Sequence, residues 1–136
     1  MSILSVVLPA YNEEQMVGKT CRVLHEVLLG AGISYELVLV NDGSKDNTWN
    51  EILKAGEKDP NILGVHFSRN FGKEAAVFAG LAQASGDAVA VMDCDLQHPP
   101  ATIVEMYRLW TEGYEVVEGV KASRGKENPL HTFCAN

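Results

Sequence analysis

Two aspartates and a glutamine follow an apolar run near residue 90 and could together bind a metal ion. Residues 88–92 are continuously apolar, and Asp93, Asp95 and Gln97 come next at alternate positions. Two like charges held close together repel unless a cation or hydrogen-bond donors offset them. Carboxylate and amide oxygens are hard ligands that suit Mg²⁺ or Mn²⁺ better than zinc. The spacing therefore predicts a divalent cation site of the kind that bridges a diphosphate.

The elements that must position these side chains alternate along the chain between strand-like and helical patterns. The expected strands are Leu4 to Leu8, Tyr35 to Val40, Ile62 to Phe67, Ala88 to Met92 and Tyr114 to Gly119. The expected helices carry their apolar faces at Val17, Cys21, Leu24 and Leu28, at Trp49, Ile52 and Leu53, along 73–84, and at Ile103, Met106, Tyr107 and Trp110. This alternation predicts an α/β fold with a Rossmann-like, mostly parallel sheet flanked by helices.

Helix signals bound these segments. Gly30 and Gly32 end the first helix, Ser44 or Asp46 caps the second, and the prolines at 99–100 begin the fourth.

Polar residues gather where the first four expected strands end. The segments are Pro9–Glu14, Asn41–Ser44, Ser68–Lys73 and Asp93–Pro100. The carboxyl ends of parallel strands meet at one edge of the sheet, where open α/β sheets bind their ligands. The turns at the opposite edge carry ordinary turn residues. This asymmetry predicts a binding cleft at the carboxyl edge.

Each segment also has a purely local interpretation. The residues 42–44 fit a turn with a helix cap, and Glu13 and Glu14 fit the acidic first turn of a helix. Arg69 and Lys73 could be solvated charges, but they bracket the start of a helix, where phosphate binds readily. Packing would explain Tyr11, and either packing or substrate contact would explain His98. For the remaining histidines (His25, His66 and His131) and the three cysteines, a structural role is expected.

Composition restricts the function classes. The chain has 136 residues, enough for one domain, and its net charge of −7 disfavours a nucleic-acid partner. The three cysteines have no CxxC spacing and no framework pattern, which favours a reducing compartment. No apolar run is long enough to cross a bilayer, so the chain is expected to be cytoplasmic.

Taken together, the four polar segments resemble the inverting glycosyltransferases of family 2 with the GT-A fold, especially the dolichyl- and polyprenyl-phosphate sugar transferases. The matching motifs are Pro9-Ala10-Tyr11-Asn12-Glu13-Glu14, Val40-Asn41-Asp42-Gly43-Ser44-Lys45-Asp46-Asn47-Thr48, Arg69-Asn70-Phe71-Gly72-Lys73 and Asp93-Cys94-Asp95-Leu96-Gln97-His98-Pro99-Pro100. The resemblance covers nearly the whole chain and implies one nucleotide-sugar-binding domain over residues 1–136.

The resemblance implies a role for each matching residue. Those lining the nucleotide would be Pro9, Ala10, Tyr11, Glu13, Asp42 and Lys73, with Asp42 bonded to the base. Asp93 and Asp95 would be the catalytic residues and, with Gln97, would hold Mg²⁺ or Mn²⁺ against the diphosphate. In a later basic loop, Arg124 would meet a phosphate.

The reaction implied is metal-dependent transfer of a sugar, with inversion, from a nucleotide-diphospho-sugar to a polyprenyl phosphate or glycan acceptor. Uridine is favoured over guanosine as the base. A phosphate acceptor is already largely anionic at neutral pH, because its second pKa is about 6, so a dedicated general base is dispensable.

Relatives in this family continue beyond Asn136, commonly with membrane helices on the cytoplasmic face, so the chain is expected to be incomplete at its C-terminus. The segment 130–136 has no stop signal and is expected to interrupt an element. The sheet edge left open predicts a homodimer. Three alternatives stay open: a non-catalytic nucleotide-sugar or metal-binding module, a nucleotidyltransferase, and a phosphoacceptor receiver. The acidic loop at 9–14 disfavours the nucleotidyltransferase, and the placement of the acids disfavours the receiver.

Overall fold

Continuous runs of valine, leucine and isoleucine form the central strands, because each of these strands is buried on both faces. The computed structural model describes residues 2–97, 99–114, 116–120 and 130–135. Its elements are β1 (Ile3–Ala10), α1 (Val17–Gly30), β2 (Ser34–Asn41), α2 (Thr48–Lys58), β3 (Ile62–His66), α3 (Lys73–Gln83), β4 (Ala88–Val91), α4 (Pro100–Thr111), β5 (Val116–Val120) and β6 (Leu130–Ala135).

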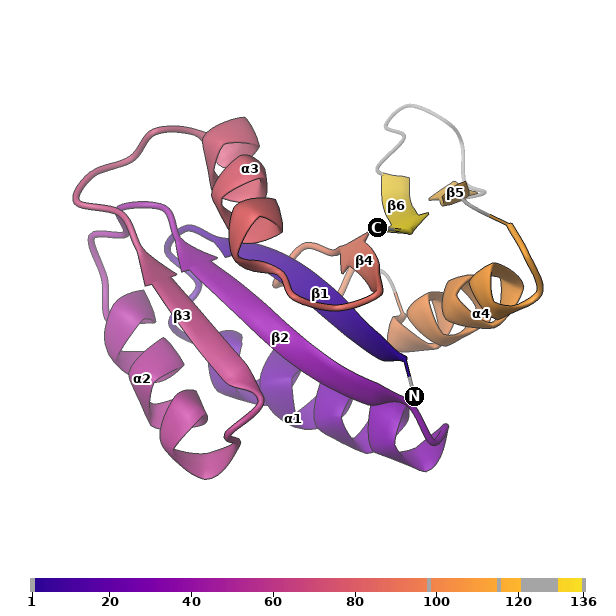
Figure 1. Ribbon diagram of the computed structural model, residues 1–136. Helices are drawn as coiled ribbons and strands as arrows, with labels where there is room; N and C mark the ends of the chain where they lie inside the picture. The colour runs from indigo at the N-terminus through magenta and orange to yellow at the C-terminus, as the bar shows by residue number, and fades with distance from the viewer. Residues whose placement is uncertain (1, 98, 115, 121–129, 136) are drawn as a thin grey trace.

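The strands form one sheet in the order β3-β2-β1-β4-β6-β5 (Figure 1). The first four strands in the chain pair in parallel, whereas β6 pairs antiparallel with both β4 and β5. The predicted α/β class with a mostly parallel sheet is therefore confirmed. The sequence did not identify β6, which occupies most of the segment expected to be an interrupted element.

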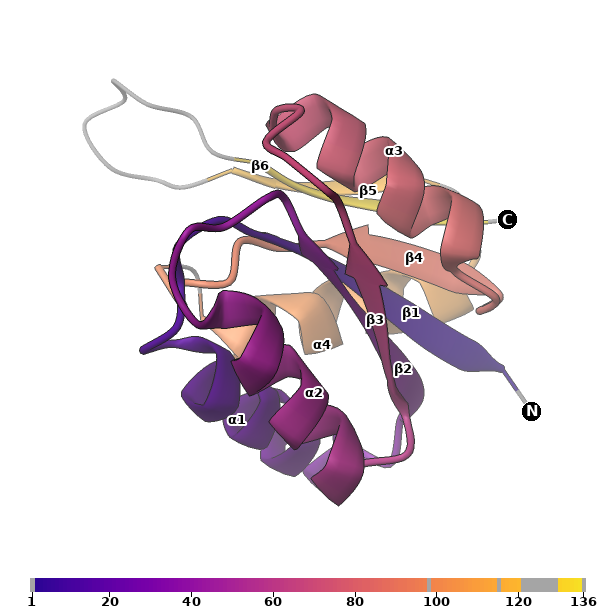
Figure 2. The same ribbon diagram turned by 90° about the vertical axis from the view of Figure 1, so that its left-hand side faces the viewer.

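Helices cover both faces of the sheet. In Figures 1 and 2, α3 lies alone on one face, while α1, α2 and α4 cover the other. Alternate residues of a strand point to opposite faces, so Val6 and Leu8 join the larger core and Val7 joins the core under α3. Gly80 lets α3 approach closely, because a Cβ there would lie 2.3 Å from Cγ1 of Val7.

Most expected boundaries agree with the structure to within two residues. Helix α2 begins after Asn47, which is one residue beyond the alternative cap at Asp46 and three beyond the one at Ser44. Within it, Ile52 is buried and Trp49 is partly buried, but Leu53 is 48% exposed and does not face the sheet. The prediction that Leu53 faces the sheet was therefore wrong.

Within the residues that the structure describes, none of the helices is both long enough and apolar enough to cross a membrane.

Candidate functional site

The loop after β1 is fixed against the loop after β2 by a reciprocal pair of hydrogen bonds. The Asn12 amide donates to Oγ of Ser44 at 2.9 Å, and the Lys45 amide donates to Oδ1 of Asn12, also at 2.9 Å. Asn12 has a φ of 54°, a left-handed conformation that asparagine tolerates better than most residues. This turn leaves Tyr11 42% exposed at the edge of the sheet.

The next residues of the same loop are tied to the start of α2. The Glu13 amide donates to Oγ1 of Thr48 at 2.8 Å, and the Asn47 amide donates to Oε1 of Glu14 at 2.9 Å. Burial acts to raise the pKa of Asp46, but hydrogen bonds from Thr48 and from the Glu14 amide outweigh it and lower that pKa. These bonds favour the ionised form of Asp46.

The loop after β2 is in turn bound to the loop after β3. Asp42 is only 4% exposed, and its Oδ1 accepts a 2.8 Å bond from the Phe71 amide. Nδ2 of Asn70 donates to the other carboxylate oxygen at 3.2 Å and to the Asp42 carbonyl at 3.1 Å. Gly43 has a φ of 67°, and a Cβ there would lie 2.1 Å from the carbonyl carbon of Arg69. A residue larger than glycine would therefore separate the two loops.

The start of α3 meets the loop after β4 through an ion pair. Nζ of Lys73 lies 2.7 Å from Oδ1 of Asp93. Gly72 precedes the helix with a φ of 103° and provides no side-chain cap. Arg69, on the same loop, stacks its guanidinium 4.2 Å from the ring centre of Phe71.

The loop after β4 carries Asp93 and Asp95. Leu96, which follows them, has a left-handed backbone conformation with a φ of 60°. Oδ1 of Asp95 accepts a 3.1 Å bond from the Gln97 amide. Burial, followed by the negative charges of Asp95, Asp93 and Asp46, raises the pKa of Glu13 above its ordinary value of 4.5. The charges of carboxylates on the loops after β4 and β2 therefore act on Glu13, which lies on the loop after β1.

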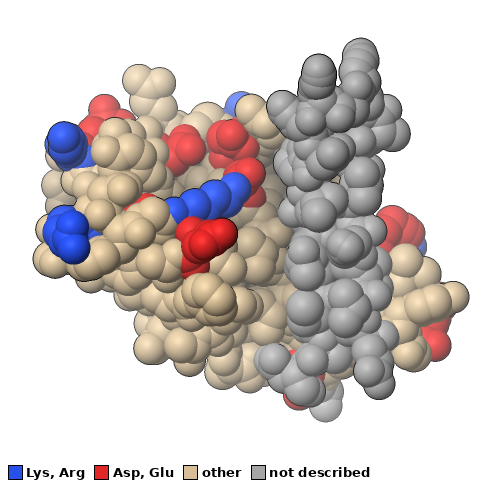
Figure 3. Space-filling view, turned by 90° about the horizontal axis from the view of Figure 1, so that it is seen from above, with Lys and Arg blue, Asp and Glu red and all other residues tan. Residues whose placement is uncertain are grey.

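These contacts join the four predicted segments into one structure, which we call the carboxyl-edge site. It comprises residues 9–14, 42–48, 69–73 and 93–97. Acidic and basic side chains lie against one another on the face seen in Figure 3. Within the described part of the chain, no group of three or more His, Cys, Asp or Glu side chains is arranged to hold a metal ion. A cation at Asp93 and Asp95 would need further oxygen ligands, and a bound diphosphate and water are the usual source for Mg²⁺.

The structure brings together nearly all the residues that the sequence singled out. Pro9 and Ala10 end β1, Tyr11 and Glu13 follow it, and Asp42 follows β2. The contact of Lys73 with Asp93 links two further predicted residues. Arg124 and His98 lie outside the described residues. The sequence analysis assigned no role to Asn70, although this residue lies within the matching motif at 69–73.

Of the cysteines and histidines expected to be structural, Cys21 and Cys94 are buried, and His66 packs within the fold. Burial raises the pKa of Cys21 and of Cys94 to about 12, so both thiols stay protonated. Nδ2 of Asn41 lies 2.9 Å from Nδ1 of His66, which stacks on Trp49.

A comparison with models of protein families identifies the family of this chain. The model described as "Glycosyl transferase family 2" matches residues 5–132. The chain belongs to glycosyl transferase family 2. The resemblance stated from the sequence motifs is thus confirmed.

Curated relatives agree with the family assignment. Over 123 residues the chain is 45% identical to the uncharacterized glycosyltransferase YkcC of Bacillus subtilis, covering 90% of this chain and 38% of that protein. Over 125 residues it is 38% identical to the undecaprenyl-phosphate 4-deoxy-4-formamido-L-arabinose transferase of Pseudomonas aeruginosa, covering 91% and 37%. The chain thus spans about two fifths of the length of these relatives.

Solved structures share the GT-A fold. A mannosyltransferase from Pyrobaculum calidifontis, in complex with GDP-Man and Mn²⁺, superposes with a TM-score of 0.77 at 20% identity, over 96% of this chain and 44% of that one. Glucosyl-3-phosphoglycerate synthase from Mycobacterium tuberculosis, in complex with Mn²⁺, UDP and phosphoglyceric acid, superposes with a TM-score of 0.71 at 26% identity, over 92% and 44%.

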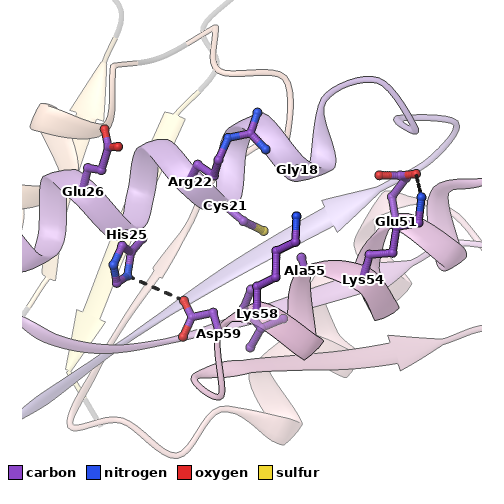
Figure 4. A pocket seen from close by; sticks show the side chains of 11 residues that line it. Gly18, Cys21, Arg22, His25, Glu26, Glu51, Lys54, Ala55, Lys58 and Asp59 are labelled. Atoms are coloured by element: carbon purple, nitrogen blue, oxygen red, sulfur yellow. Dashed lines mark hydrogen bonds and ion pairs between the residues drawn. The ribbon is translucent and has the colours of Figure 1, made fainter.

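A hollow lies between α1 and α2, away from the four loops, and we call it the α1–α2 groove (Figure 4). Its volume is about 470 Å³, and its lining includes Cys21, His25, Lys54, Lys58 and Asp59. Its two acidic residues at the α2 end have local partners: Lys54 pairs with Glu51 at 3.4 Å, and Nδ1 of His25 lies 3.8 Å from Asp59. The Tyr35 hydroxyl donates to Asp59 at 2.6 Å.

Proposed function

We propose that the carboxyl-edge site binds the nucleotide-diphosphate part of a sugar donor, and that the protein transfers the sugar to a polyprenyl phosphate. The observation that carries the proposal is the convergence of Glu13, Asp95 and Asp93: burial, followed by the charges of the two aspartates, raises the pKa of Glu13. Repulsion of this kind disfavours a site that remains without a cation, and it favours a divalent ion.

The proposed roles follow the four loops. Pro9, Ala10, Tyr11 and Glu13 line the nucleoside, and Asp42 faces its base. Oxygens of Asp93, Asp95 and Gln97 suit Mg²⁺ or Mn²⁺. Arg124 contacts a phosphate. The carboxylate of Asp42 already holds Phe71 and Asn70, so it would also fix the wall of the base pocket.

The chemistry proposed is a single displacement at the anomeric carbon, which inverts its configuration. A bound divalent ion would neutralise charge that develops on the leaving nucleoside diphosphate. The chain's own residues would orient the donor: the loops at 9–14 and 42–48 hold the nucleoside, and the start of α3 faces the phosphates. An acceptor phosphate is largely anionic at neutral pH, because its second pKa is about 6, and needs no base from the protein.

The acceptor and the base of the donor are supported by the relatives. The Pseudomonas relative is named as an undecaprenyl-phosphate transferase, which supports a polyprenyl phosphate acceptor. The structure at 26% identity holds UDP, whereas the one at 20% identity holds GDP-Man. We therefore favour a UDP-sugar as the donor.

Calorimetric titration with UDP- and GDP-sugars, with and without Mn²⁺, tests this proposal, with Asp95→Asn as the control. We expect Mn²⁺-dependent binding that the substitution abolishes. No binding of any donor to the folded chain would contradict it. Binding without transfer to a polyprenyl phosphate would instead support a nucleotide-sugar-binding module that lacks catalysis.

A further inference from the structure

We propose that Lys73 takes the place of the divalent cation at Asp93 in the free protein, and moves to the donor diphosphate when the ion binds. The inference rests on the proposed function and adds an exchange of partners at the same site. It makes Lys73 a positioning residue whose contact depends on the metal.

The Lys73–Asp93 pair differs from the other Lys and Arg ion pairs of the described residues. Nζ of Lys73 and Oδ1 of Asp93 are 2.7 Å apart across two loops. The other pairs, of Lys54 with Glu51 and of Arg108 with Glu105, join residues three apart on one helix. The side chains of Lys73 and Asp93 are 65% and 34% exposed. A pair this accessible can break without moving the fold.

The position of Lys73 in its helix needs such a partner. It is the first residue of α3, where the helix dipole favours anions and disfavours cations. A phosphate is the group that this end of a helix attracts. The lysine is therefore poorly placed in the free protein except through its bond to Asp93, and it would be well placed beside a bound phosphate.

One ammonium cannot offset all the negative charge that gathers here. Burial and the charges of Asp95 and Asp93 act together on Glu13, so at least three carboxylates share this region. A divalent ion supplies two charges where Lys73 supplies one. Lysine carries a compact charge on a flexible four-carbon stem, so its head can change partners at little cost.

The exchange predicts that removing Lys73 changes the affinity for the metal ion and the affinity for nucleotide in opposite directions. Without nucleotide, Lys73 and the metal ion compete for Asp93, so removing the lysine strengthens metal binding. With nucleotide and metal together, the released lysine contacts the diphosphate, so removing it weakens nucleotide binding. A purely structural lysine would change both affinities in the same direction or change neither.

The test is a Mn²⁺ titration of Lys73→Met, followed by electron paramagnetic resonance of the free ion. Lys58→Met is the matched control, because it removes one charge in the α1–α2 groove, remote from Asp93. We expect Lys73→Met to bind Mn²⁺ about two- to fivefold more tightly than Lys58→Met, as expected for a partly exposed ion pair. At saturating Mn²⁺, we expect Lys73→Met to bind UDP about tenfold more weakly.

Two outcomes would overturn the inference: equal Mn²⁺ affinities in the two methionine variants, or unchanged UDP affinity in Lys73→Met. Lys73→Arg keeps the charge and should bind Mn²⁺ as the natural protein does. The proposed function fails separately, if the natural protein binds Mn²⁺ neither alone nor with UDP or GDP.

Discussion

The carboxyl-edge site and the α1–α2 groove are both rich in charge, but they handle that charge in opposite ways. In the groove, Glu51 pairs with Lys54 on the same helix, and Asp59, just beyond that helix, accepts a hydrogen bond from Tyr35 of β2. At the carboxyl edge, Glu13 carries a raised pKa because burial and neighbouring carboxylates oppose its ionisation. The groove is an open hollow of about 470 Å³, yet Glu51 and Asp59 in it already have partners within the fold.

This contrast indicates that carboxylates lying close together mark a binding site better than the size of a hollow does. A groove between two helices arises wherever their side chains diverge, and paired surface charges along it contribute little. Carboxylates that remain close together need something to hold them there. At the carboxyl edge, hydrogen bonds between backbone amides and side chains of neighbouring loops supply that restraint.

The largest expected effect would break this restraint at Gly43. Gly43→Ala should lower the free energy of unfolding by about 3 kcal/mol, since it adds a strained left-handed alanine and a Cβ overlap. The closest atoms are backbone atoms of Arg69 and Asn70, which cannot move aside. Urea denaturation measures the change.

Gly18→Ala is the matched control in the groove. There a Cβ would lie 3.3 Å from the guanidinium of Arg22, the movable end of a flexible side chain. We expect no loss, and a gain of up to about 1 kcal/mol from the higher helix propensity of alanine. An equal loss in both variants would contradict the contrast between the two regions.

The next effect concerns Asp42. Asp42→Ala should cost about 2 kcal/mol, because it leaves the Phe71 amide without its acceptor beside a buried position. Glu51→Ala, which removes an exposed pair in the groove, should cost less than about 0.5 kcal/mol. Urea denaturation of both variants gives the comparison. Equal costs would mean that Asp42 does not connect the two loops.

A smaller effect, with a defined pH dependence, is expected at Glu13. Its pKa is raised in the folded state, so its ionisation destabilises the fold increasingly as the pH rises above 4.5 towards the raised value. Glu13→Gln should therefore increase the free energy of unfolding at pH 7, by less than about 1 kcal/mol. The gain should vanish below pH 4.5, where the carboxyl is protonated in both states. A gain that is independent of pH would point to packing instead.

The smallest effect is expected at Lys58 in the groove. Lys58→Ala should change stability by less than about 0.5 kcal/mol. It should also leave the affinity for UDP with Mn²⁺ within about twofold of that of the natural protein, because it is remote from the carboxyl edge. Calorimetry checks the affinity, and a tenfold loss would place the nucleotide in the groove.

The sequence predicted most of the fold because its strands are buried on both faces. Such strands appear as unbroken apolar runs, and their alternation with helices implies parallel order. The strand β6 was missed, since its pairing with β4 depends on residues more than forty positions apart. Leu53 was misplaced because residues 52 and 53 cannot be assigned to the core or to solvent by apolarity alone.

The position of the site could be predicted, but its internal contacts could not. The order of the elements places residues 9–14, 42–48, 69–73 and 93–97 at one edge of the sheet. The bond of Lys73 to Asp93 and the hold of Asp42 on Phe71 depend on how far each loop extends beyond its strand. The left-handed backbone at Leu96 could not be predicted either, because a leucine in the sequence does not indicate this conformation.

Paramagnetic broadening of amide NMR signals by Mn²⁺ tests the central claim most directly, because it reports both regions in one experiment. We predict that substoichiometric Mn²⁺ broadens the amide signals of Glu13, Asp95 and Gln97 and spares those of His25 and Lys58. Addition of UDP should extend the broadening towards Phe71 without moving its centre. Broadening centred on the α1–α2 groove, or spread evenly over the acidic surface, would contradict the account.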